Sequence, residues 1–115
     1  VVPLPGLLEF YSQPLGFARN DDPVDFGRWV HAAVSWDGGI ARLYLDGVLA
    51  KAVPMEGAVL SKGTVLYLGS DGLNGTAPFG GIDEVKIWSV VRSEQEICED
   101  GTGAWVPDAD PPCVY

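Results

Sequence analysis

The stretch SWDGGIARLYLDG, residues 35–47, decides the fold because it places two tight turns between three segments of alternating side chains. Asp37-Gly38-Gly39 supplies the positive φ angles that a hairpin needs, and Asp46-Gly47 is the favoured pair for a type I′ turn. The sequence therefore predicts a continuous antiparallel meander of three strands, at residues 29–36, 40–45 and 48–53.

Alternation separates the two faces of this meander. One face is apolar, with Val30, Ala32, Val34 and Trp36 from the first strand and an apolar row of Ala41, Leu43 and Leu45 from the second. The other is mixed and carries Trp29, His31, Ala33, Ser35, Arg42 and Tyr44. Such a sheet fits one layer of a sandwich, with its mixed face toward solvent or a groove. His31 has no Asp, Ser or Cys partner nearby in the sequence, so a structural or surface role is expected.

The rest of the chain favours an all-β sandwich or barrel, because fifteen glycines and nine prolines divide it into short segments. Further strands are predicted at residues 7–12, 65–69 and 81–88. Ser93 and Glu96 have the spacing of a capping box, which predicts a single helical turn at 93–97. Residues from Glu99 onward are expected to be irregular.

The formal net charge is −9, from 16 acidic and 7 basic residues. Phosphate contacts need clustered Lys and Arg, so the charge argues strongly against a nucleic-acid partner and against docking on anionic lipid. No apolar stretch approaches the roughly 20 residues that span a bilayer, so no membrane insertion is expected. Positively charged partners remain possible, namely calcium, amines or a basic protein surface. The alternative is that the negative charge only keeps the domain soluble.

Cys98 and Cys113 enclose EDGTGAWVPDADPP, a stretch whose composition would not stay packed without a tether. We therefore expect a Cys98–Cys113 disulfide, which implies an oxidising compartment. CxxC spacing is absent, so zinc is not expected. Asn74-Gly75-Thr76 is a glycosylation sequon in a glycine-rich segment, which agrees with that compartment and makes Asn74 the expected acceptor.

Four stretches occur in a familiar order: RWVHAAVSWDGG (28–39), RLYLDGVL (42–49), LYLGS (66–70) and FGGIDEVKIWSVVRSEQEI (79–97). Together they resemble the laminin G-like, pentraxin-like jelly-roll domains of the concanavalin A-like lectin and glucanase superfamily. The resemblance implies an antiparallel two-sheet jelly-roll sandwich.

Complete domains of that family are longer than this chain, and the family's N-terminal strands have no counterpart before Leu7. We therefore interpret residues 1–97 as the C-terminal two-thirds of the family domain, incomplete at the N-terminal side, and residues 98–115 as a disulfide-pinned irregular tail. Another chain, or further sequence, would complete the open edge. A self-contained, shortened sandwich is the alternative.

The superfamily includes glycoside hydrolases, which need two carboxylates on one face, flanking the scissile bond. The acidic pairs Asp21-Asp22, Asp83-Glu84 and Glu99-Asp100 are adjacent in sequence, so on a strand they would point to opposite faces. Glu94 and Glu96 lie on the expected helical turn, where that spacing diverges. No catalytic residue is predicted, and the remnant of a glycoside hydrolase is the remote alternative. Asp83 is expected to be structural, accepting hydrogen bonds from loop amides.

The resemblance implies binding to saccharides or to extracellular protein partners, often through calcium in rim loops. Two loops have the oxygen ligands that calcium prefers. The first contains Asp21 and Asp22, with Asn20 and Asp25, and the second contains Asp71, with Ser70 and Asn74. Their alternative role is as turn formers. Glycan stacking would use Trp29, Trp36, Tyr44, Tyr67 or Trp88, which otherwise pack. We expect an extracellular, secreted or cell-surface module for adhesion or assembly with other chains, and as alternative a calcium-dependent lectin.

Overall fold

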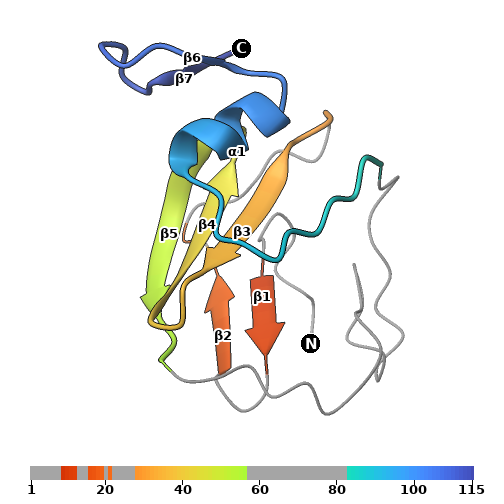
Figure 1. Cartoon of the computed structure of the whole chain (residues 1–115), viewed down its shortest axis with the longest axis vertical. Helices are drawn as coiled ribbons and strands as arrows, with labels where there is room; N and C mark the ends of the chain where they lie inside the picture. The colour runs from red at the N-terminus through yellow and green to blue at the C-terminus, as the bar shows by residue number, and fades with distance from the viewer. Residues whose placement is uncertain (1–8, 13–15, 20, 22–27, 57–82) are drawn as a thin grey trace.

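The three-stranded meander is the centre of the molecule. The computed structural model describes residues 9–12, 16–19, 21, 28–56 and 83–115. In it β3 (Ala32–Trp36), β4 (Ile40–Leu45) and β5 (Val48–Pro54) form one antiparallel sheet in chain order, as predicted (Figure 1). The first strand begins three residues later than expected. The predicted strand at 65–69 lies outside the described residues.

Both turns of the meander have the backbone geometry that their residues predicted. Asp46 and Gly47 have φ values of 50° and 76°, the two successive positive angles of a type I′ turn. Gly38 has φ 94°. The Asp37 carboxylate closes the first turn by accepting from the backbone N–H groups of Gly39 and Ile40, each at 2.8 Å.

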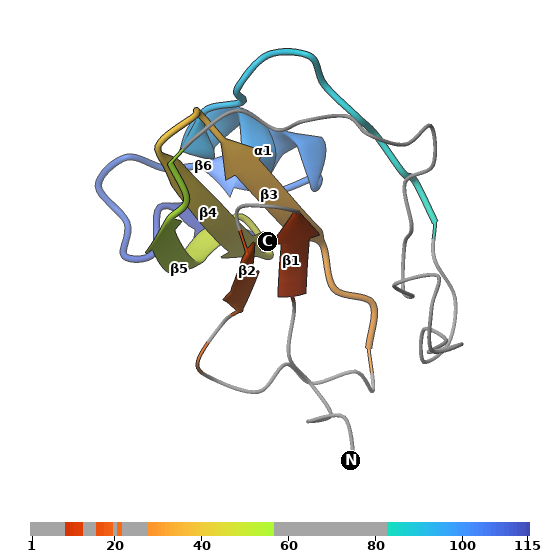
Figure 2. The same ribbon diagram turned by 90° about the horizontal axis from the view of Figure 1, so that it is seen from below.

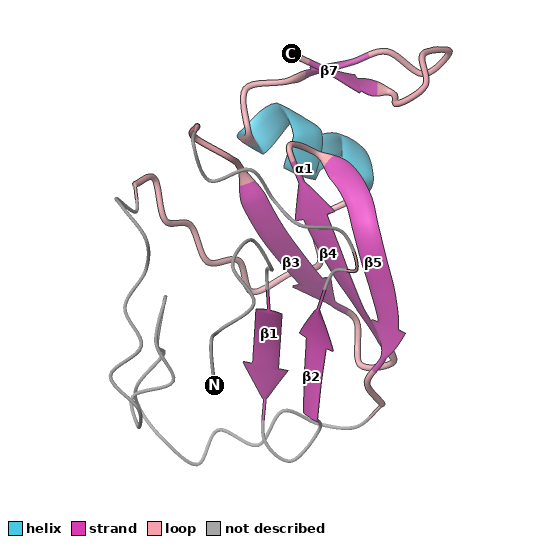
Figure 3. Cartoon of the chain, turned by 180° about the vertical axis from the view of Figure 1, so that it is seen from behind, coloured by secondary structure: helices cyan, strands magenta, loops and turns pink. Residues whose placement is uncertain are grey.

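A second hairpin packs on the apolar face of the meander. Its strands are β1 (Glu9–Ser12) and β2 (Gly16–Arg19), and the second of these was not predicted. β2 lies against β4 and β5, which brings Ala18 onto the meander (Figure 3). The core of buried residues consists of Ala18, Ala41, Leu43 and Met55, with Phe10, Trp36 and Val53 packed around it.

The mixed face of the meander is covered rather than open, which corrects the sequence expectation. Tyr44 and Ser35 are buried on it, and Figure 2 shows α1 (Glu94–Asp100) and the β1–β2 hairpin on opposite sides of the meander. The apolar face is in turn only partly covered: Val34, which pairs with the buried Leu43, is 38% exposed. Both faces of this sheet therefore contribute to packing.

The helix α1 has the predicted cap but is longer than the single turn expected. The Ser93 hydroxyl accepts from the backbone N–H of Glu96 at 3.1 Å, and the Glu96 carboxylate accepts from the backbone N–H of Ser93 at 3.0 Å. Ile97 and Cys98 form its buried side. Among the described residues, no helix has the length and apolar character to span a bilayer.

The tail contains a small hairpin where the sequence predicted irregular structure. β6 (Ala104–Trp105) pairs antiparallel with β7 (Cys113–Val114). The Cys98–Cys113 disulfide is present, with Cα atoms 5.6 Å apart, and joins β7 to α1. It packs directly on the β4–β5 turn, because a Cβ on Gly47 would contact Cys113 Sγ. The tail is thereby fixed to the meander.

Candidate interaction surface

Residues 85–91 form an exposed apolar segment, and no strand includes them. Val85, Ile87, Trp88, Val90 and Val91 are exposed, with Ile87 at 74%. The sequence predicted a strand over 81–88; the part of it that the structure describes, 83–88, is not a strand, which corrects that prediction. Glu84, immediately before the segment, has φ 55°, in the left-handed region. A strand forms only with a hydrogen-bonding neighbour, and within the described chain this segment has none.

The Asp83 carboxylate marks the beginning of this region. It accepts a hydrogen bond from the backbone N–H of Glu84 at 2.8 Å. Asp83 therefore binds a loop amide, as the sequence led us to expect, although no strand begins there.

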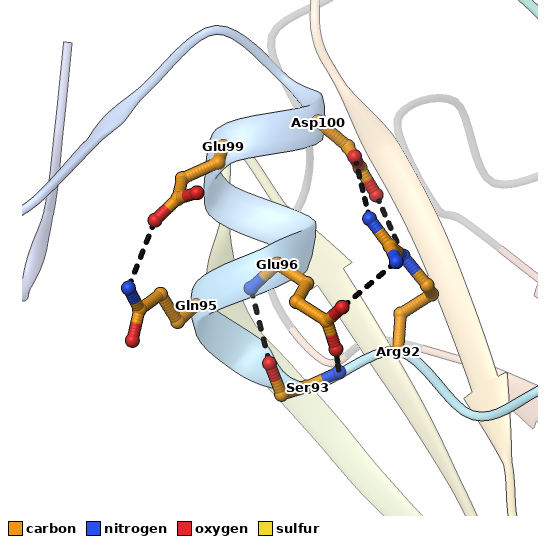
Figure 4. A network of polar contacts seen from close by, with 6 residues as sticks. All are labelled: Arg92, Ser93, Gln95, Glu96, Glu99 and Asp100. Atoms are coloured by element: carbon orange, nitrogen blue, oxygen red, sulfur yellow. Dashed lines mark hydrogen bonds and ion pairs between the residues drawn. The ribbon is translucent and has the colours of Figure 1, made fainter.

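Arg92 fixes the C-terminal end of the exposed segment to α1. Its guanidinium donates two hydrogen bonds to Asp100, at 3.1 and 2.9 Å, and one to Glu96 at 2.8 Å (Figure 4). On its other side it stacks over the Trp88 ring, 3.9 Å from the ring centroid. The Arg92 guanidinium therefore connects the segment to the helix, through Trp88 on one and through Glu96 and Asp100 on the other.

The same network shifts two pKa values in the directions that its contacts require. The hydrogen bonds to Asp100 raise the pKa of Arg92. The backbone and side-chain hydrogen bonds from Ser93, together with the nearby Arg92 charge, lower the pKa of Glu96. The network was not anticipated, although the four-residue spacing of Arg92 and Glu96 was a signal that could have revealed part of it.

Asp46 ties the type I′ turn to the chain that enters the meander. Its carboxylate accepts from the backbone N–H of His31 at 3.0 Å and forms an ion pair with Arg28 at 2.8 Å. Its own N–H donates to the carbonyl of His31 at 2.8 Å. Asp46 is thus a structural residue. Burial raises the pKa of Tyr115, with a smaller contribution from the Asp46 charge.

His31 packs under the C-terminal tail. A Cβ on Gly101 would meet the imidazole ring and the Tyr115 hydroxyl, so ring, glycine and hydroxyl are close together. The ring Nδ1 is buried and makes no hydrogen bond in the described structure.

Of the predicted calcium ligands, Asp21 is the one that the structure describes. Its carboxylate is exposed and accepts from Lys51 Nζ at 3.0 and 2.9 Å, so its charge is paired with an ammonium group. Asp22 and Asp71, with the glycosylation residue Asn74, lie outside the described residues. No group of three or more His, Cys, Asp or Glu side chains suited to a metal occurs in the described part of the chain.

The aromatic residues considered for glycan stacking differ in how exposed they are. Tyr44 is buried, and burial raises the pKa of its hydroxyl. The half-buried Trp36 donates from Nε1 to the carbonyl of Met55 at 2.8 Å. Trp29, at 71% exposure, and Trp88, at 48%, present ring surface to solvent. Tyr67 lies outside the described residues.

Antiparallel sheets stacked as a partial sandwich place the protein in the all-β jelly-roll class. Residues 9–98 match the family profile of the concanavalin A-like lectin/glucanases superfamily, in its laminin G-like group. The chain belongs to that family.

Two of the similar curated proteins are Pappalysin-1 from Mus musculus and from Homo sapiens. The mouse protein is 35% identical over 102 residues, covering 79% of this chain, and the human protein is 34% identical over 79 residues, covering 64%. The chain spans only 6% and 5% of the length of these two relatives.

One solved structure shares the fold. It is that of an S-layer domain-containing protein (residues 221–444) from Clostridium thermocellum, with a TM-score of 0.58 and 21% identity. The match covers 74% of this chain and 44% of the other.

Proposed function

We propose that this chain is a non-catalytic binding or assembly module that works outside the cell, where it contacts other protein chains or domains in adhesion or in matrix or surface structure. The observation that carries the proposal is the exposed apolar segment 85–91. Five large apolar side chains in seven consecutive residues are exposed there, and exposed apolar surface of this kind is typical of interaction sites.

The extracellular location is supported by the disulfide and by the family. Cys98 and Cys113 are both buried and bonded to each other. Disulfides persist in secreted and cell-surface proteins, whereas thiols are kept reduced in the cytosol. Laminin G-like domains are typical of extracellular proteins. Glycosylation of Asn74 belongs to the same proposal.

The domain organisation is part of this proposal. Residues 1–97 correspond to the C-terminal two-thirds of a laminin G-like sandwich, and residues 98–115 are the pinned tail. The neighbour that segment 85–91 lacks among the described residues would then come from another chain or from additional sequence of the same protein. The relatives support modular use, since a stretch similar to this chain is a small part of a much longer protein in each.

A calcium-dependent lectin is the second candidate, because Trp29 offers an exposed ring face. Apolar faces of sugar rings stack on such surfaces. Asp21 would contribute carboxylate oxygen, together with Asp22 and Asp71, but calcium would have to displace Lys51 from it. Millimolar calcium should raise the melting temperature if this candidate is correct. It should leave the melting temperature unchanged if Lys51 keeps the carboxylate.

The proposed function is tested by presenting the 115-residue chain to three sets of targets: extracellular matrix proteins, a glycan array and polysaccharide substrates. We expect binding to protein in the presence of EDTA, weakened in the variant Ile87→Lys and retained in Trp29→Ala. Glycan binding that requires calcium and Trp29 would instead support the lectin. Release of reducing sugar would overturn the non-catalytic assignment.

A further inference from the structure

We draw no further inference here: the strongest candidate, the apolar surface patch of Ala104, Val106 and Val114 on the β6–β7 hairpin, carries none because nothing in the described part of the chain shows what covers it.

Discussion

Asp37 stabilises the first turn of the meander through three hydrogen bonds to one carboxylate. The N–H groups of Ile40 and Gly39 contribute most, and the Arg42 guanidinium, 3.0 Å away, contributes next. Together they lower the pKa of Asp37 from 3.8 to about 2. Because the folded state binds the proton less tightly than the unfolded chain, this carboxylate stabilises the fold only while it is ionised.

The melting temperature should therefore fall as the pH decreases from about 4 to about 2, the window between the two pKa values of Asp37. The variant Asp37→Asn cannot titrate, so it should be less stable than the parent at neutral pH and approach the parent near pH 2. Thermal unfolding followed by circular dichroism across that window measures the effect.

Arg42→Gln is the matched control for this prediction. It removes the ion pair but leaves the two backbone hydrogen bonds of Asp37, which are the larger causes of the low pKa. Most of the acid dependence attributed to Asp37 should therefore persist. If Arg42→Gln flattens the profile as much as Asp37→Asn does, the backbone bonds are not the main cause.

Substitutions at Gly38 and Gly47 distinguish the cost of backbone strain from the cost of a steric clash. Both have positive φ, but a Cβ on Gly38 would meet nothing within 4 Å, whereas on Gly47 it would collide with Cys113 of the disulfide. Gly38→Ala should cost about 1 kcal/mol of unfolding free energy, from strain alone. Gly47→Ala should cost roughly 2–4 kcal/mol, since the packed sulfur has to move. Urea titration measures both losses, and equal losses would contradict the packing of the tail on this turn.

At the level of elements, α1 depends on its N-terminal cap because it has only seven residues. Ser93→Ala removes the acceptor for the Glu96 N–H and should cost about 1 kcal/mol. Gln95→Ala removes an exposed hydrogen bond to Glu99, 2.9 Å long, and should cost at most about 0.5 kcal/mol. Chemical denaturation distinguishes the two variants, and similar costs would show that the cap does not determine the helix.

Turn chemistry made the meander predictable, because Asp46-Gly47 and Asp37-Gly38-Gly39 restrict the backbone locally. β2 was missed because four residues are too few to show a period, and its position depends on the contact of Ala18 with the core. The strand predicted over 81–88 failed for the opposite reason. Its residues prefer β structure, but that preference is expressed only beside a pairing strand.

The burial of Tyr44 could not be predicted from the sequence either. Alternation shows which residues share a face, but it does not show which remote element packs on that face. Here α1 lies on that side, and its Glu94 is close enough for its charge to affect the Tyr44 hydroxyl. Sequence reasoning gave the family and the disulfide, whereas the calcium loops around Asp21 and Asp71 stay a prediction. It did not give the Arg92 network, which depends on Trp88, Glu96 and Asp100 meeting in space.

At the scale of the whole molecule, the disulfide secures the C-terminal tail. Replacing Cys98 and Cys113 by Ala releases a closed loop of about 15 residues and should lower the unfolding free energy by about 3 kcal/mol. Unfolding in urea with and without reductant measures this. The parent should be sensitive to reductant and the double variant insensitive. An unchanged midpoint for the reduced parent would contradict the stabilising role.

The sulfur bridge also determines how the molecule would carry a mechanical load. A pull on Tyr115 would pass from Cys113 to Cys98 through one covalent bond and enter α1 directly, bypassing the chain between them. Fully extended, the 15 residue steps from Cys98 to Cys113 would span roughly 50 Å, and the disulfide prevents this extension under tension. Because the disulfide also packs against Gly47, part of the load passes to the β4–β5 turn. The C-terminal segment therefore transmits force to the sheet without extending.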